Sequence, residues 1–320
     1  MATGKGYEGI LGVVKESTWG TEVAVTQKVP VTAVRCQQTY QPVPNKALLG
    51  VHGANIDGRG AADVSLEISA HLHYGMRLFL LEQFMAGYTD EVSGADHYDY
   101  TDNSEGKSLT VAWQEGVSVH AVTGFKPNEF ILTGTPADGV MMTFRGMFQD
   151  RLVGSATNTT AVLNALSDPT KHALYSGEFT LHIADIGQAL ATTYKPAGFT
   201  LTLNRNQTNA IVNDREPLEP IENDECAGSL ELNFPRHTTD YFLTNHNTYV
   251  PMFAKLVIGD GTNSKEFRLN RMLVIEDPTP PVEGKGLLTP TVRFKLFHDK
   301  GNTNAHADFP FTALAAIYES

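Results

Sequence analysis

The chain has 320 residues, 41% of them hydrophobic and 19% charged, which describes a folded globular protein and excludes a disordered one. Its formal net charge of −12 makes it a poor candidate for gripping nucleic acid, because that grip comes from Lys and Arg side chains that neutralise phosphates. Two cysteines are too few for a disulfide framework and fit a reducing cytoplasm, and neither a signal peptide nor an apolar run of the roughly 20 residues that span a bilayer is evident.

Residues 1–28 are rich in Gly and Thr, and we expect them to form an N-terminal arm. A first β domain is expected over residues 29–152, beginning with a strand at Val29–Val34. A long loop with several Gly and Pro residues follows at 41–62, and a loop of that length is usually functional or ordered by a partner. The next segment, Asp63–Leu72, alternates apolar and polar residues, which indicates a half-buried strand.

Apolar residues then recur at helical spacing, which predicts a helix over Gly75–Ala86 that stops at the following glycine. Residues 153–172 have the composition of a linker, with a short helix expected over Thr160–Leu166. The strands expected between the first helix and the linker are Ser108–Gln114, Val117–Phe125, Phe130–Gly134 and Val140–Phe148.

A second β domain is expected over residues 173–300, and a C-terminal arm over 301–320. Its longest loop, at 205–227, is acidic. A weak helical pattern at Thr239–Tyr249 takes the place of the stronger helix of the first domain, and the Gly- and Asn-containing segment 259–264 predicts a hairpin turn. The strands expected in this domain are Glu178–Ile183, Gly198–Asn204, Gly228–Phe234, Pro251–Ile258, Glu266–Ile275 and Thr291–Phe297.

The two halves share short sequence patterns in the same order. Ser65-Leu66-Glu67-Ile68 reappears as Ser229-Leu230-Glu231-Leu232. Met142-Thr143-Phe144-Arg145-Gly146-Met147-Phe148 has a counterpart in Val292-Arg293-Phe294-Lys295-Leu296-Phe297. Because a repeat is the signature of a modular architecture, we predict an all-β protein with a minor helix, built of two tandem β-sandwich domains related by internal duplication.

Few residues form patterns that carry chemistry. His71 and His73 share a strand face, but no third metal ligand is identifiable, so solvent- or interface-facing histidines are favoured. The acidic residues at 216–225 lack the order of a calcium loop, and a solvated loop or one that meets a basic neighbour is favoured. Asp57-Gly58-Arg59-Gly60 resembles part of a phosphate loop but lacks its Lys and its helix. We predict no catalytic, cofactor-binding or metal-binding residue, and therefore no enzyme.

Several stretches together resemble a known family. The first is Glu16-Ser17-Thr18-Trp19-Gly20-Thr21, near the start of the chain. The second is the pair Gly58-Arg59, which precedes Val64-Ser65-Leu66-Glu67-Ile68 and the apolar helix that follows. The third is Phe199-Thr200-Leu201-Thr202-Leu203-Asn204, followed after a loop by Gly228-Ser229-Leu230-Glu231-Leu232. With these stretches the chain resembles the major tail tube proteins of bacteriophages with long, flexible, noncontractile tails. The unequal helices of the two halves depart from a strict repeat of the family pattern.

The resemblance implies a structural subunit of the virion tail, made in the cytoplasm of the bacterial host. Subunits of the family pair edge strands around a ring, and the rings stack into a hollow tube for genome ejection. A chain with two tube domains would close a pseudo-sixfold ring with three copies, and its long loops and terminal arms would contact the next ring. The implied partners are the chain itself, tail proteins such as the tape measure and the tail terminator, and DNA that passes an acidic lumen without sticking.

Two alternatives remain open at this point. The same fold would serve another tail component, such as a tail-completion or baseplate-hub protein. A two-domain carbohydrate-binding module or enzyme is disfavoured, because such modules display exposed aromatic residues and this chain has only two tryptophans, Trp19 and Trp113.

Overall fold

The computed structural model of the protein describes most of the 320 residues. The described residues are 10–45, 55–74, 77–90, 96–101, 103–116, 118–169, 171–172, 177–209, 217–222, 225–236, 240–259, 263–279, 289–298 and 315–319. They form an all-β fold with three short helices, and this confirms the predicted fold class.

The first half contains two helices, α1 (Phe79–Met85) and α2 (Thr160–Asn164). Its strands are β1 (Leu11–Lys15), β2 (Gln27–Val29), β3 (Val31–Asn45), β4 (Asn55–His71), β5 (His73–Tyr74), β6 (Asp96–Asp99), β7 (Leu109–Glu115), β8 (Ser118–Thr135), β9 (Gly139–Met147) and β10 (Asp150–Val153). The strands β3, β4, β9 and the second part of β8 form one antiparallel sheet in that order. The strands β2, β1, β7, the first part of β8 and β10 form another.

The strand β8 belongs to both sheets. Up to Phe125 it pairs with β7, and from Lys126 onward it pairs with β9. A bulge between Pro127 and Glu129 lies next to this change of partner, and a bulge bends a strand and increases its twist. The sequence predicted two separate strands here, and the bulge with its proline accounts for that difference.

The second half has one helix, α3 (Tyr241–Thr248). Its strands are β11 (Lys171–His172), β12 (Phe179–Asp185), β13 (Thr193–Tyr194), β14 (Gly198–Asn204), β15 (Gln207–Thr208), β16 (Ile221–Glu222), β17 (Ala227–Asn233), β18 (Met252–Gly259), β19 (Ser264–Val274), β20 (Thr291–Phe297) and β21 (Ala315–Glu319). One sheet runs β14, β17, β20, β19, and the other runs β13, β12, β18, β19, β21.

The two halves therefore repeat one order of elements. In each half a long strand, β8 or β19, passes between the two sheets. The helices α1 and α3 also occupy the same place in the order, and each ends at a residue in the left-handed conformation, Ala86 (φ 64°) or Tyr249 (φ 53°). The repeated sequence blocks fall on β4 with β9 and on β17 with β20. This shared order supports the internal duplication proposed from the sequence.

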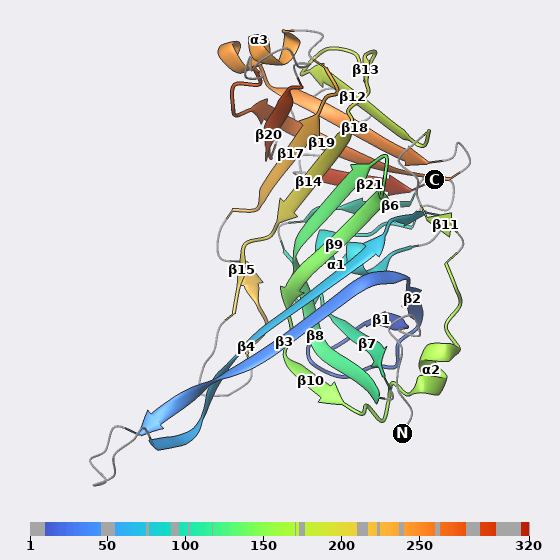
Figure 1. The fold of residues 1–320 in the computed structure, drawn as a ribbon, viewed down its shortest axis with the longest axis vertical. Coiled ribbons are helices and arrows are strands. Elements are labelled where there is room, and N and C mark those ends of the chain that lie inside the picture. Colours follow the sequence, from blue (N-terminus) through green and yellow to red (C-terminus); the bar gives the residue numbers. More distant parts are fainter. Residues whose placement is uncertain are drawn as a thin grey trace.

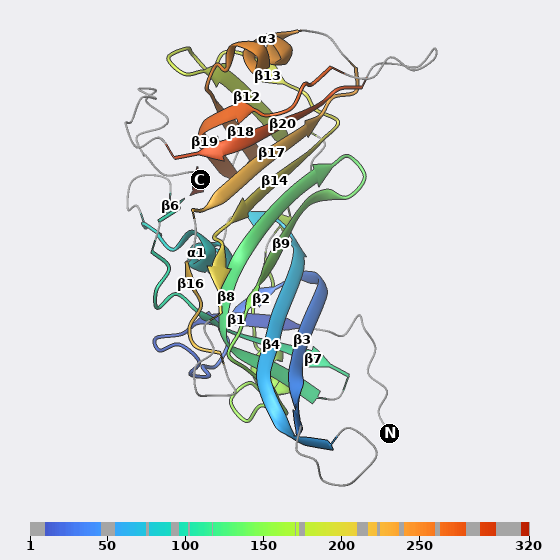
Figure 2. The same cartoon turned by 90° about the vertical axis from the view of Figure 1, so that its left-hand side faces the viewer.

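Besides the short pairing of β5 with β11, the halves are joined edge to edge at two places. The second part of β8 pairs with β14, so that β3, β4, β9, β8, β14, β17 and β20 follow one another in a single continuous sheet (Figures 1 and 2). At the second place β21 lies between β19 and β6 of the first half. Tyr98 on β6 donates a hydrogen bond of 3.2 Å to Glu319 on β21, which also forms a 2.5 Å ion pair with the buried Lys265.

The hydrophobic core runs through both halves without a break. It fills the space between the sheets with alternate residues of the strands, such as Leu66 and Ile68 on β4 and Leu230 and Leu232 on β17. The rings of Phe130 from the first half and Phe267 from the second stack with their centroids 6.3 Å apart. The helix α1 is buried in this core, and its Glu82 is compensated there by Lys15 at 3.0 Å and Arg77 at 2.8 Å.

In three segments the structure contains strands that the sequence did not predict. The N-terminal segment is not only an arm, because β1 and β2 are paired strands in which Leu11, Val13 and Val29 are buried. The expected loop at 41–62 contains the paired ends of β3 and β4, which project beyond the rest of the chain in Figures 1 and 2. The C-terminal segment contains the buried strand β21. In each case tertiary pairing overrode a local composition typical of loops.

Candidate functional site

The candidate site is the outer edge of β3, where the large sheet ends in the first half. Among the described strands, β3 pairs with β4 alone. Its counterpart β14 has β17 on one side and β8 on the other. An unpaired strand edge presents a row of backbone N–H and C=O groups that can pair with another strand. Among the described strands, the β14 edge is thus covered in one half, and the equivalent β3 edge in the other half has no partner strand.

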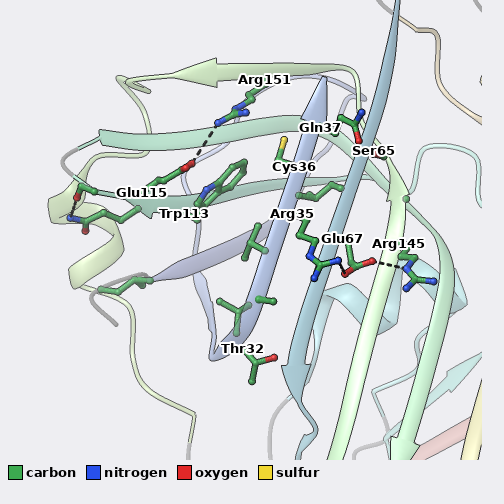
Figure 3. A pocket seen from close by; sticks show the side chains of 18 residues that line it. Thr32, Arg35, Cys36, Gln37, Ser65, Glu67, Trp113, Glu115, Arg145 and Arg151 are labelled. Carbon is green, nitrogen blue, oxygen red and sulfur yellow. Dashed lines mark hydrogen bonds and ion pairs between the residues drawn. The ribbon is translucent and has the colours of Figure 1, made fainter. Parts of the chain in front are cut away.

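A groove of about 1010 Å³ lies beside the open edge, between the sheet of β3 and the end of β7 (Figure 3). We call it the β3 groove. Its floor and walls are formed by residues 31–37 of β3, 65–67 of β4 and 113–116 at the end of β7, with Arg145 and Arg151. Arg151 lies 3.6 Å from Glu115 and Arg35 lies 3.8 Å from Glu67, so these charged residues of the lining form ion pairs beside apolar ones such as Val34 and Trp113.

Cys36 lies on β3 in this groove. Burial raises the pKa of its thiol from 9.0 to about 11, so the thiol is protonated at neutral pH and is a weak nucleophile. It is not joined to Cys226, the only other cysteine of the chain. The groove therefore has no activated thiol, and its recognition groups are the strand edge and the charged side chains.

The exposed face of the large sheet carries the same ion-pair arrangement in both halves. Arg145 on β9 donates to Glu67 at 2.8 Å and to Glu129 at 3.0 Å. Arg293 on β20 donates to Glu231 at 2.9 Å and to Glu276 at 2.8 Å. We call these two sets the Glu–Arg–Glu brackets. The hydrogen bonds to Glu67 and Glu129 raise the pKa of the Arg145 guanidinium, and those to Glu231 and Glu276 do the same for Arg293.

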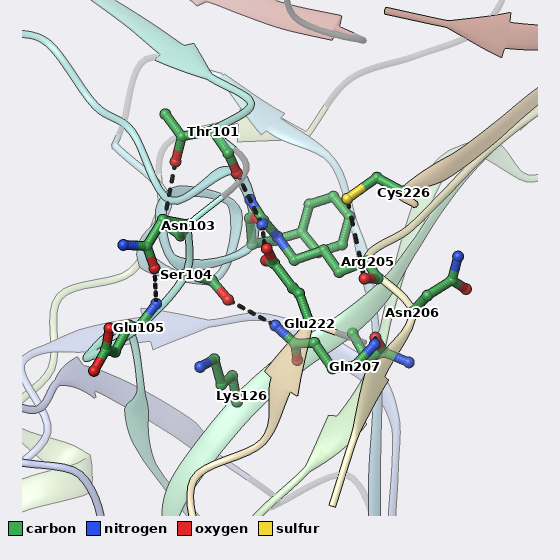
Figure 4. Close-up of polar contacts among 12 residues, drawn as sticks. Thr101, Asn103, Ser104, Glu105, Lys126, Arg205, Asn206, Gln207, Glu222 and Cys226 are labelled. Carbon is green, nitrogen blue, oxygen red and sulfur yellow. Dashed lines mark hydrogen bonds and ion pairs between the residues drawn. The ribbon is translucent and has the colours of Figure 1, made fainter. Parts of the chain in front are cut away.

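The covered edge is held by a buried polar cluster at the junction of the halves (Figure 4). Arg205, which follows β14, is fully buried and donates to the carbonyl oxygens of Phe84 and Thr101 and to the carboxylate of Glu222. Its guanidinium also lies 4.3 Å from the ring centre of Tyr100, a cation–π distance. Arg205, with Glu222 paired to it, is in this way fixed against the first half.

Lys126 on β8 makes a second contact with the same loop. Its side chain is 2% exposed and lies 2.7 Å from Glu219, and it donates to the carbonyl oxygen of Pro220 at 2.8 Å. The backbone N–H of Gly106 donates to the same Glu219 carboxylate at 2.7 Å. The prediction that the acidic loop meets a basic neighbour is confirmed for Glu219 and Glu222. Glu216 and Asp224 lie outside the described residues.

The structure gives no support to the other candidate sites from the sequence. His71 ends β4 and His73 begins β5, which pairs with β11, and no group of three or more His, Cys, Asp and Glu residues in the described part of the chain could hold a metal ion. The segment Asp57–Gly60 is part of β4 and precedes no helix. None of the helices in the described part of the chain is both long and apolar enough to cross a membrane.

Sequence reasoning missed the buried cations at this junction, Lys126 and Arg205. Each lies among strand-forming residues, and a charged side chain in such a run carries no local signal of its partner. A usable signal was present in the acidic loop that follows Arg205, because acids near a strand-end cation can neutralise it. To assign these acids to Lys126 and Arg205, one would need to know that β8 pairs with β14. The two strands lie 63 or more residues apart in the sequence, so no local pattern predicts their pairing.

Comparisons with known proteins add one firm result. A family model described as "Phage tail tube protein" matches residues 6–313, nearly the whole chain. No protein among those with curated descriptions matches. Among solved structures, the sheath/tube terminator of an extracellular contractile injection system (PVC, extended state) is similar at 11% identity with a TM-score of 0.30, covering 47% of this chain and 96% of that one. A similarity of that size carries no argument here.

Proposed function

The chain belongs to the phage tail tube protein family, and from that premise we propose that it is the subunit that assembles with its own copies into the stacked rings of a tail tube. Family membership makes it a structural component of the virion tail. The ring, its symmetry and its role in genome ejection are the proposal. The observation that carries it is the continuous sheet, in which one edge is already covered by a domain of the same chain while the equivalent edge is open.

A head-to-tail contact repeated between identical copies either closes into a ring or runs on as a filament. In this chain the contact between β8 and β14 joins two units of the same topology. If the same contact recurs between copies, a ring contains an even number of units, and three copies give six. Closing a sheet on itself is one of the few ways to remove exposed strand edges altogether, which favours a ring over an open end.

The exposed face of the large sheet is the surface we assign to the inside of the tube. The chain as a whole is acidic, and on this face each bracket holds one arginine between two glutamates, which leaves the bracket with one net negative charge. Arginines neutralised in this way offer little to DNA phosphates, since affinity for the DNA backbone comes from cations that are available to replace counterions. DNA would therefore pass without being retained.

The test is electron microscopy of the purified protein over a range of concentrations. We expect rings with sixfold appearance, or tubes with a regular axial repeat, and analytical ultracentrifugation should show association that depends on concentration. A protein that stays strictly monomeric at high concentration would overturn the proposal.

The family match also suits a tail-completion or baseplate-hub role, and copy number separates the two. Quantitative mass spectrometry of purified virions should find on the order of hundreds of copies for a tube that stacks many rings, whereas a cap or hub needs only a handful. A count of only a handful of copies per virion would favour the cap or hub role over the tube.

A further inference from the structure

We propose that a pocket beside α3 binds a primary alkylammonium group. This pocket, which we call the α3 pocket, has a volume of about 520 Å³ and lies where α3 meets β12 and β13, at one end of the molecule (Figures 1 and 2). It is lined by residues 183–185, 188, 189 and 192, together with Tyr194 and Tyr241. The inference goes beyond the proposed function, because it concerns a single copy of the chain and does not require assembly.

The α3 pocket has a counterpart in the first half, which the strand register identifies. Lys15, the last residue of β1, lies opposite Leu109, the first residue of β7. Asp185, the last residue of β12, lies opposite Met252, the first residue of β18. In both halves the register with the next strand shifts directly after that first residue. Asp185 therefore occupies the position of Lys15.

The helices of the two halves align through their last turns. The left-handed residue that ends each helix donates its backbone N–H to the carbonyl oxygen of Glu82 in α1 and of Asn245 in α3, so these two residues are equivalent. The side chains make equivalent contacts as well. Lys15 forms an ion pair of 3.0 Å with Glu82. In the second half Asn245 donates a hydrogen bond of 2.6 Å to Asp185.

The two equivalent sites differ in charge. In the first half the Lys15 ammonium compensates the Glu82 carboxylate and also lies 5.3 Å from the ring centre of Phe79. In the second half the acid is on the strand, and the helix supplies only a neutral amide. None of the ion pairs in the described part of the chain includes Asp185, whose printed partners are the neutral side chains of Tyr241 and Asn245. The second site therefore keeps a negative charge without a cation.

The two sites also differ in how they are filled. Val29 on β2 corresponds to Tyr194 on β13, because both lie opposite a leucine at the equivalent position of the neighbouring strand. Two residues earlier, Gln27 corresponds to Thr192. The Gln27 side chain accepts a hydrogen bond of 2.9 Å from the backbone N–H of Phe79 at the start of α1. The shorter Thr192 is exposed and lines the α3 pocket. The second half thus lacks both the ammonium and the long amide that occupy this place in the first.

The carboxylate of the α3 pocket suits an ammonium better than a guanidinium. Its Oδ1 atom already accepts two hydrogen bonds of 2.6 Å, from the hydroxyl of Tyr241 and the amide of Asn245. A guanidinium binds a carboxylate best through both oxygens at once, whereas an ammonium is a compact charge that needs only one. The remaining oxygen of Asp185 is therefore the expected contact for the ammonium.

Aromatic rings complete the site. Tyr194 and Tyr241 both line the pocket, with ring centroids 6.3 Å apart and an angle of 22° between the rings. Aromatic faces attract cations that approach within about 6 Å. Burial and the nearby Asp185 carboxylate raise the pKa of both tyrosines, so their hydroxyls stay protonated at neutral pH. The charge of the pocket is then that of the one carboxylate.

The experiment is saturation-transfer NMR of n-butylammonium with the full-length chain, at low salt and at a dilution where sedimentation shows single copies. We expect n-butylammonium to bind at least about tenfold more tightly than n-butanol, which has the same alkyl chain without the charge, since a hydrogen bond to a charged group is worth a factor of that size. Asp185→Asn should weaken binding by about the same factor. The matched control is Asp138→Asn, which removes a carboxylate from an exposed turn and should leave binding unchanged.

A second variant tests the equivalence of the two sites directly. Asp185→Lys combined with Asn245→Glu rebuilds in the second half the ion pair that Lys15 forms with Glu82. This double variant should fold, as circular dichroism would show, and should lose the binding of n-butylammonium, because the chain then supplies its own ammonium.

The ammonium could come from a free amine or from a lysine side chain of a second copy, and assembled protein separates these sources. A free amine as ligand predicts that wild-type assemblies still bind n-butylammonium and that Asp185→Asn assembles normally. A lysine of a second copy predicts that assemblies no longer bind the probe and that Asp185→Asn weakens assembly.

The result that would overturn the inference is measured on single copies. If n-butylammonium binds wild type no better than n-butanol does, or binds Asp185→Asn as tightly as wild type, the α3 pocket is not an ammonium site. A failure of the wild-type chain to assemble would count against the proposed function alone, because this binding is measured without assembly.

Discussion

The two equivalent strands β3 and β14 have opposite surroundings. The edge of β14 is covered by β8, and the loop that follows it is held against the first half by buried Arg205 and Lys126. Among the described strands, β3 pairs with β4 alone and lies beside a groove, and the paired far ends of β3 and β4 project away from the body (Figure 1). The same strand arrangement therefore occurs once with its partner and once without it.

The comparison distinguishes the residues that a stable fold needs from those that a contact between copies would need. The covered joint contains apolar side chains and neutralised buried charges, as expected of a contact that never opens. The β3 edge has charged residues beside it, which is compatible with exposure to water in a single copy. The predictions below compare the two joints, beginning with the largest expected effect.

The strongest effect should come from the cation buried at the covered joint. Arg205→Met leaves the Glu222 carboxylate without its partner in a nearly water-free position, and breaking a buried ion pair from one side costs about 3–5 kcal/mol of unfolding free energy. Urea denaturation of the purified chain measures this loss. Adding Glu222→Leu to Arg205→Met should recover much of it, because the double variant removes both charges. A loss below about 1 kcal/mol in the single variant would show that the cluster does not hold the halves together.

Equivalent positions on the two edges should differ in their sensitivity to truncation. Leu201 on β14 is fully buried, while Cys36, at the same position on β3, is only partly buried. Leu201→Ala should cost about 2–5 kcal/mol, since it leaves a cavity in the packed joint. Cys36→Ala should cost less than about 1.5 kcal/mol in a single copy, because the side chain is only partly buried and loses a single heavy atom. Equal losses would mean that the β3 edge is as well covered as the β14 edge.

The environment of the Cys36 thiol on β3 should also be measurable from its alkylation rate. With a pKa of about 11 instead of 9.0, Cys36 has about a hundredfold less thiolate at pH 8 than an ordinary thiol, so a Cys226→Ser variant should be alkylated about a hundredfold more slowly when folded than in urea. The rate should rise about tenfold per pH unit from 8 toward 11. Because the pKa is higher in the folded state, the associated stability is present below pH 9 and is lost as the pH rises through 11. A folded-state rate equal to that in urea would contradict the burial of this thiol.

How much of the structure could be predicted from the sequence depends on how far apart in the chain the interacting residues lie. Alternation along Asp63–Leu72 and Gly198–Asn204 predicted β4 and β14, because a strand with one buried face shows its period locally. The short helix at Thr160 was also predicted, and its Thr159 cap is a local signal. The β3 groove, the junction of β8 with β14 and the partners of Arg205 depend on residues far apart in the chain. No local sequence pattern predicts such pairings. Only the repeated sequence blocks indicated that two sheets would lie together.

The smallest effect is expected where the two halves are most alike. The side chains of Arg145 and Arg293 are 50% and 49% exposed, so solvent screens their bonds to the glutamates. Arg145→Met should lower the unfolding free energy by no more than about 1 kcal/mol, and Arg293→Met should have a similarly small effect, because the two brackets share their strand arrangement and exposure. Urea denaturation of both variants beside wild type makes the comparison. A clear shift of the urea midpoint in one variant and none in the other would show that the equivalence between β9 and β20 is only superficial.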